Sequence, residues 1–64
     1  MGRRVNPGTL VQTRGLGAVT VYEVAKMGRF EVGAMVETLE AMLASGAMVW
    51  RADGCVEPSS RRPQ

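Results

Sequence analysis

Between residues 31 and 45 the apolar residues recur every three or four positions, which is the spacing of one buried face of an α-helix. Glu31 near the start suits the positive end of the helix dipole, and Gly46 follows where a glycine commonly ends a helix. The spacing predicts a long helix. Its buried face comprises Val32, Met35, Val36, Leu39, Met42 and Leu43, and its outward face comprises Glu31, Gly33, Ala34, Glu37, Thr38 and Ala41.

A second helix is predicted to begin at Thr20. The run Thr20-Val21-Tyr22-Glu23 has the spacing of a capping box, in which the threonine hydroxyl and the glutamate carboxylate satisfy free amides at a helix start. Val21, Val24 and Ala25 supply an inward stripe, and Gly28 with Arg29 is expected to end this short helix after Met27.

The first part of the chain predicts an arm and one more helix. Residues 1–8 contain Arg3, Arg4, Pro7 and Gly8 and are expected to form a flexible basic arm. Thr9 can cap a helix of about two turns through Leu10, Val11 and Arg14, which Gly15 and Gly17 would end.

The chain after the long helix predicts a β-hairpin. Residues 48–51 have strand character, Asp53-Gly54 is a favoured pair for a tight turn, and residues 55–57 can form the returning strand. Pro58 stops that strand, and residues 58–64 have too few apolar side chains to pack, so a disordered tail is expected. The ordered domain is therefore predicted over residues 9–57.

Composition excludes several classes of function. The 64 residues include no histidine and only one cysteine, Cys55, so neither a disulfide nor a metal site is expected. The chain also lacks an evident acid–base pair and a complete phosphate-binding glycine motif, which argues against an enzyme, a cofactor or a small-molecule substrate. No apolar run reaches the roughly 18 residues that span a membrane, and a cytoplasmic protein is expected.

The predicted order of elements resembles a winged helix-turn-helix, an α+β but mainly α fold in which three helices precede a β-hairpin wing. Residues 10–15, 19–25 and 39–49 are similar to the small MarR-like and FeoC-like winged-helix proteins of bacteria, with Val24-Ala25 and Gly46 at matching positions. The resemblance implies a DNA-binding protein that regulates transcription. In such proteins the third helix enters the major groove.

Charge supports DNA binding in part. Residues 1–19 carry a net charge of +3, residues 20–50 carry −2 and residues 51–64 carry +1. Contacts to DNA, mainly to its phosphates, are therefore expected from the arm, the turn before the long helix, that helix and the wing. The predicted contact residues are Arg3, Arg4, Arg29, Thr38 and Arg51.

A protein partner is the alternative. The outward face of the long helix offers no Arg, Lys, Asn or Gln to read bases, and its glutamates repel phosphate. Its small side chains would let another protein approach closely, either a larger assembly or a second copy in a homodimer, although a simply solvated face has the same composition. The predicted docking residues are Gly33, Ala34, Glu37, Thr38 and Ala41. Among single residues, Phe30 is expected to fill the core, Trp50 to pack at the base of the wing, and Cys55 to be an unreactive thiol.

Overall fold

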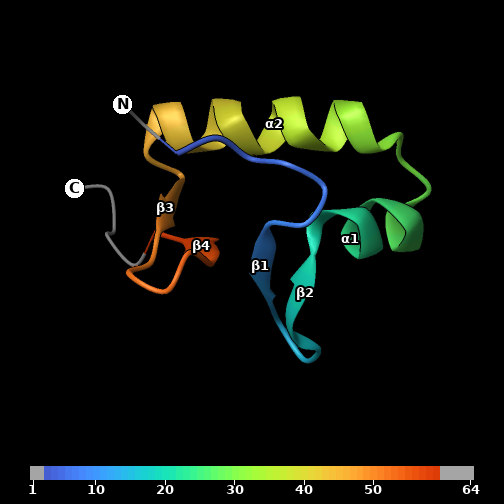
Figure 1. The fold of residues 1–64 in the computed structure, drawn as a ribbon, viewed down its shortest axis with the longest axis horizontal. Helices are drawn as coiled ribbons and strands as arrows, with labels where there is room; N and C mark the ends of the chain where they lie inside the picture. The colour runs from blue at the N-terminus through green and yellow to red at the C-terminus, as the bar shows by residue number, and fades with distance from the viewer. Residues whose placement is uncertain (1–2, 60–64) are drawn as a thin grey trace.

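A computed structural model describes residues 3–59 of the protein. Two helices and four strands follow one another along this part of the chain, as Figure 1 shows. They are β1 (Leu10–Thr13), β2 (Gly17–Thr20), α1 (Val21–Gly28), α2 (Val32–Ser45), β3 (Met48–Trp50) and β4 (Val56–Pro58). The prediction of three helices followed by a wing is wrong, because a β-hairpin stands where the first helix was expected.

The hairpin of β1 and β2 replaces the predicted first helix for local reasons. Val11 and Thr13 are β-branched, and a strand places them on one side and Leu10 and Gln12 on the other. Gly15 and Gly17 have φ angles of 91° and 71°, so both use the left-handed backbone that glycine adopts freely. These glycines reverse the chain between two paired strands instead of ending a helix.

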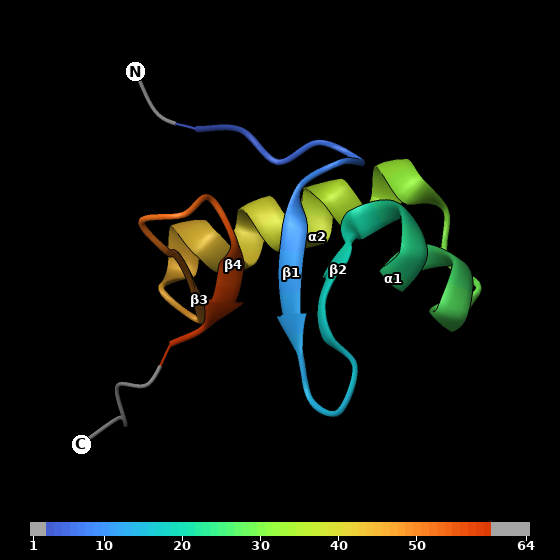
Figure 2. The same cartoon turned by 60° about the horizontal axis from the view of Figure 1, so that its bottom comes forward.

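The four strands form one mixed sheet in the order β2-β1-β4-β3. Both hairpins are antiparallel, and β1 pairs with β4 in parallel through Val11 and Val56. Figure 2 shows β1 beside β4, with α2 passing behind the strands. The predicted wing is therefore half of a continuous sheet rather than a projecting hairpin.

The core lies between this sheet and the helices. Strand register places Val19, Val11, Val56 and Trp50 on the same face of the sheet, because in this order each directly opposes the next across a strand pair. Val11 and Val56 are buried there, together with Val5, Val21, Leu39 and Met48. The opposite face of the sheet is more open to solvent.

Helix α1 begins as the sequence predicts. Thr20 is its N-cap, and the threonine Oγ1 accepts a hydrogen bond of 3.2 Å from the amide of Glu23. The helix ends at Arg29, which has left-handed angles (φ 59°, ψ 40°) and donates its amide toward the carbonyls of Ala25 and Lys26. A three-residue turn, 29–31, then leads into α2.

Helix α2 and the hairpin after it lie close to their predicted positions. The prediction that Pro58 stops the strand and begins a disordered tail is wrong, because Pro58 pairs with Met48 as the last residue of β4 and the amide of Ser59 donates to the carbonyl of Ala47. The C-cap of α2 is Gly46 in the left-handed conformation (φ 88°), and Leu39 is the one buried residue of α2. In the following turn, Gly54 donates its amide to the carbonyl of Arg51, and Asp53 Oδ1 accepts from the amide of Cys55. The Asp53-Gly54 turn is thus confirmed.

The segment expected to be a flexible arm lies beside α2 in Figure 1. Val5 is 6% exposed and belongs to the core, and its amide donates to the carboxylate of Glu40 in α2 at 3.2 Å. Thr9 is buried too and accepts from the amide of Asn6. Residues 1–2 of the predicted arm and 60–64 of the predicted tail lie outside the described residues.

Candidate interaction surface

The face of α2 that points away from the core is uncovered along the helix. Helix α2 packs against α1 and β3, and its opposite side faces outward at the top of Figure 1. All five residues predicted for protein docking are exposed there; they are Gly33, Ala34, Glu37, Thr38 and Ala41. We call these five residues the outer face of α2.

The outer face of α2 carries few polar groups. The hydroxyl of Thr38 donates to the carbonyl of Ala34 in the preceding turn at 2.9 Å, so its proton is used within the helix. Within residues 3–59 the carboxylate of Glu37 forms no ion pair or hydrogen bond. The face consists of small side chains around one free carboxylate, and it lacks the amide and guanidinium groups that read DNA bases.

Two of the predicted phosphate contacts, Arg3 and Arg4, contact other residues of the protein, although the side chain of Arg4 is 85% exposed. The guanidinium of Arg3 donates to the carbonyl of Arg51 at 3.1 Å and lies 5.7 Å from the centre of the Trp50 ring. Arg4 Nε is 4.0 Å from a carboxylate oxygen of Glu40. Trp50 packs beside the core as expected.

Among the predicted DNA-contact residues, Arg51 makes the most contacts with other side chains of the protein. Its guanidinium lies 3.0 Å from Asp53 and 3.8 Å from Glu57, and it donates to the side chain of Gln12 in β1 at 3.3 Å. These surface ion pairs are weak, but they offset the positive charge that would attract phosphate.

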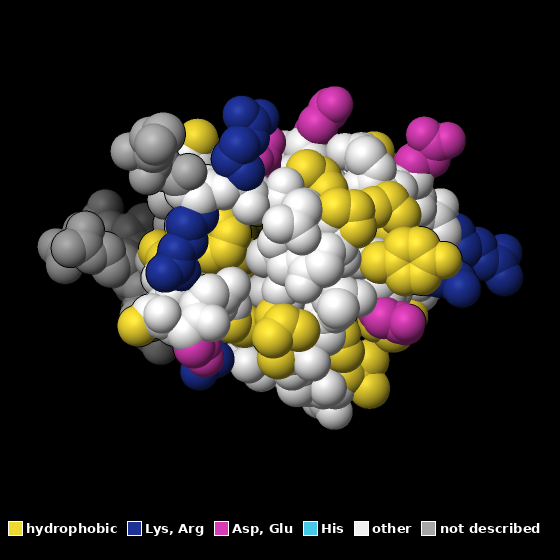
Figure 3. Space-filling model, viewed as in Figure 1, with side chains coloured by type: hydrophobic (Ala, Val, Ile, Leu, Met, Phe, Trp, Pro, Cys, Tyr) yellow, Lys and Arg dark blue, Asp and Glu magenta, His cyan; other side chains and the backbone are white. Residues whose placement is uncertain are grey.

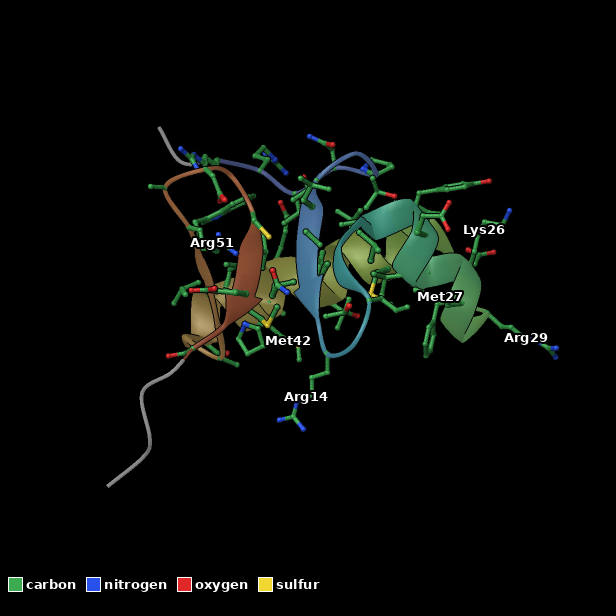
Figure 4. All side chains as sticks on the ribbon, turned by 90° about the horizontal axis from the view of Figure 1, so that it is seen from below. Arg14, Lys26, Met27, Arg29, Met42 and Arg51 are labelled. Carbon is green, nitrogen blue, oxygen red and sulfur yellow. The ribbon has the colours of Figure 1, made fainter. Side chains whose placement is uncertain are left out.

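Arg29 differs from the other predicted arginines. In the described part of the chain its guanidinium has no carboxylate partner. Figure 4 shows its side chain projecting outward at the end of the molecule opposite Arg51. The structure therefore does not gather the predicted DNA contacts into one patch.

Charge over the described residues is balanced. Residues 3–59 contain six arginines and lysines and six aspartates and glutamates, so their net charge is zero. The chain's net charge of +2 comes from Arg61 and Arg62, which lie outside the described residues. A neutral body gives little long-range attraction to nucleic acid.

Sequence reasoning missed a set of exposed apolar side chains around the first hairpin and α1. Phe30 is 60% exposed, so the prediction that it fills the core is wrong; its ring lies over Gly28, where the missing side chain makes room. Figure 3 shows apolar side chains gathered on the α1 side of the molecule. Seven large apolar residues are exposed in the part of the chain that the structure describes. Five of them lie in residues 10–30, namely Leu10, Leu16, Tyr22, Met27 and Phe30, and the other two are Met42 and Val49. Only tertiary contacts decide which side chains of such short elements are covered.

The described residues were also searched for a metal site, a reactive cysteine and a membrane-spanning helix. Within residues 3–59 no group of three or more His, Cys, Asp or Glu side chains could hold a metal ion. Cys55 is buried, with its Sγ 3.6 Å from the carbonyl of Val56. Neither helix of this part of the chain combines the length and apolar character needed to cross a membrane.

The comparisons with known proteins assign no family. No protein-family model matches the chain, and searches of curated proteins and of solved structures found no match either.

Proposed function

We propose that this protein is a docking module that binds another polypeptide through the outer face of α2. The observation that carries the proposal is that α2 packs on one side only, while Gly33, Ala34, Glu37, Thr38 and Ala41 are all exposed on the other. Small side chains let a second helix approach closely, at the 8–10 Å between axes that is usual for packed helices.

The fold favours a rigid docking surface. The left-handed C-cap Gly46 ends α2, and the inner face of this helix is held by Leu39 in the core. A surface on a helix that is packed against the body of the protein loses little conformational entropy when a partner binds.

The test is capture of partner proteins from the native organism with matched variants of the full chain. Ala34→Arg places a long charged side chain in the outer face, and Ala52→Arg makes the same change at an exposed position in the β3–β4 turn. We expect Ala34→Arg to lose the partner and Ala52→Arg to keep it, with circular dichroism showing both variants folded. Equal capture by both variants would contradict the proposal.

DNA binding, the leading expectation from the sequence, is the second candidate because Arg29 has no carboxylate partner among residues 3–59. A titration with duplex DNA at low and moderate salt tests it. DNA contact predicts affinity that falls steeply with salt and is lost in Arg29→Glu. No binding at low salt would exclude this candidate.

A further inference from the structure

Three of the exposed apolar side chains stand at or next to turns of the chain. Leu16 lies in the turn between β1 and β2, Met27 lies in the last turn of α1, and Phe30 follows in the connection to α2. Their exposed fractions are 62%, 53% and 60%. The first hairpin projects from the body of the protein beside α1 in Figure 1, so its turn is a convex part of the surface. We call Leu16, Met27 and Phe30 the apolar tips.

The exposed position of Phe30 follows from the way α1 ends. The amide of Phe30 donates to the carbonyl of Ala25 at 2.8 Å, which closes the last turn of the helix. Arg29 has the left-handed angles that favour glycine (φ 59°), and no other non-glycine residue in the described part of the chain has a positive φ. The ring of Phe30 then lies over Gly28, where an added Cβ would come within 2.5 Å of it. The backbone thus holds a large apolar ring outward.

Each apolar tip follows a basic residue by one or two positions along the chain. These basic residues are Arg14, Lys26 and Arg29. None of them has a carboxylate partner in the part of the chain that the structure describes. Figure 4 shows their three side chains projecting outward around Met27, away from Arg51. The apolar tips are therefore flanked by positive charges that are available to a second molecule.

The carboxylates of the same region leave an excess of positive charge. They are those of Glu23 and Glu31, so residues 14–31 carry three positive charges against two negative ones. The exposed side chain of Met42 in α2 has different surroundings, because the charged residue nearest to it in the chain is Glu40. Met42 is thus a matched apolar position without neighbouring positive charge.

We propose that the apolar tips bind the surface of a membrane that contains anionic lipids. The tips enter the boundary between headgroups and acyl chains, while the neighbouring ammonium and guanidinium groups stay at the level of the lipid phosphates. Peptides dock in grooves or along sheet edges, whereas a fluid bilayer accommodates convex points from separate elements. Leu16 and Met27 are aliphatic, and nucleic acid bases stack on aromatic side chains instead. An anionic bilayer therefore matches both the shape and the charge of this surface.

This surface shares no residue with the outer face of α2. The first hairpin points away from α2 in Figure 1, so a membrane that contacts the apolar tips leaves the outer face uncovered. The inference goes beyond the proposed docking role, and either one can fail without the other.

Co-sedimentation of the full chain with vesicles tests the inference. Vesicles of phosphatidylcholine and phosphatidylserine, mixed in a ratio of roughly 2:1, are compared with vesicles of phosphatidylcholine alone. We expect binding to the mixed vesicles at low salt, binding about tenfold weaker or less to the neutral ones, and a loss of binding as added salt screens the charges. No binding to the mixed vesicles at low salt, or binding to single-stranded DNA in its place, would overturn the inference.

Matched substitutions assign the binding to the apolar tips and their charges. Phe30→Ser should weaken vesicle binding about tenfold, whereas Met42→Ser should leave it unchanged, with circular dichroism showing both variants folded. Arg29→Gln should weaken binding about fivefold, and Glu23→Gln should strengthen it, because the membrane surface attracts cations and repels carboxylates. Equal weakening by Phe30→Ser and Met42→Ser would contradict the assignment, as would equal effects of Arg29→Gln and Glu23→Gln.

A fluorescence measurement separates insertion from attraction by charge alone. Phe30→Trp adds a tryptophan at an apolar tip, whereas the single tryptophan of the wild type, Trp50, packs beside the core. Lipids with brominated acyl chains should therefore quench the fluorescence of the variant more strongly than that of the wild type. Equal quenching of the two proteins would show that position 30 stays outside the bilayer, and the inference would then be wrong.

Discussion

Val56 offers the sharpest test of the sheet. It is fully buried, opposes Trp50 across one strand pair and Val11 across the other, and so occupies the centre of the core face. Val56→Ala removes two methyl groups, worth about 1.6 kcal/mol at roughly 0.8 kcal/mol each, and leaves a cavity whose lining loses further contacts. We expect a loss of about 2–3 kcal/mol from a domain whose total stability is about 3–10 kcal/mol.

The assay is urea unfolding of Val56→Ala beside Val49→Ala, which makes the same deletion on the outer face of β3, where Val49 is 38% exposed. The Val49 variant should lose less than about 1 kcal/mol. Because Val11 and Val56 are register partners, the double variant Val11→Ala/Val56→Ala should depart from additivity by about 0.5 kcal/mol or more. Equal losses for Val56→Ala and Val49→Ala, together with additive Val11 and Val56 effects, would refute the parallel pairing of β1 with β4.

Three further predictions concern local contacts and are checked by denaturant unfolding at concentrations where the chain is monomeric. Thr20→Ala should lower the free energy of unfolding by about 1 kcal/mol, because it removes the hydroxyl that caps α1. Thr20→Ser keeps a hydroxyl and should lose much less, and equal losses for the two variants would count against the cap. Gly46→Ala should lower the free energy of unfolding by about 1 kcal/mol, because position 46 has room for a side chain but its left-handed backbone angles disfavour one. Gly33→Ala should leave the free energy of unfolding unchanged or raise it, because position 33 is helical and also has room. A larger loss for Gly33→Ala than for Gly46→Ala would contradict both assignments. Glu40→Ala removes the carboxylate that accepts a hydrogen bond from the amide of Val5, so it should lower the free energy of unfolding by about 1 kcal/mol and speed exchange of the Val5 amide hydrogen. An unchanged exchange rate would mean that this hydrogen bond is not formed in solution.

The sequence predicted those elements whose signals are local. The capping residue Thr20, the three- and four-residue spacing around Leu39, and the turn pair Asp53-Gly54 each specify a structure through neighbours a few residues away. These elements lie within a few residues of their expected bounds. The exposure of Ala34 and its neighbours follows from the same helical spacing.

Contacts between distant residues were not predictable in this way. The parallel pairing of β1 and β4 joins Val11 to Val56, and no local pattern in either strand specifies the other. Gly15 also suits both a helix end and a hairpin, so its presence could not distinguish them. The carboxylate partner of Arg4 and the exposure of Phe30 likewise depend on the tertiary fold. The resemblance to MarR-like and FeoC-like proteins stays a prediction.

The place of β4 between β1 and β3 has a consequence for how the chain folds. Its pairing with β1 closes a loop of 45 residues, which costs about 3 kcal/mol of chain entropy before the sheet can form. Folding is therefore expected to be cooperative across the whole domain, since no early segment completes the core. A fragment cut before Val56 would leave β1 with an unpaired edge and Val11 uncovered, and such edges pair readily with other chains. Truncation in the β3–β4 turn should thus produce an aggregating chain rather than a smaller stable domain.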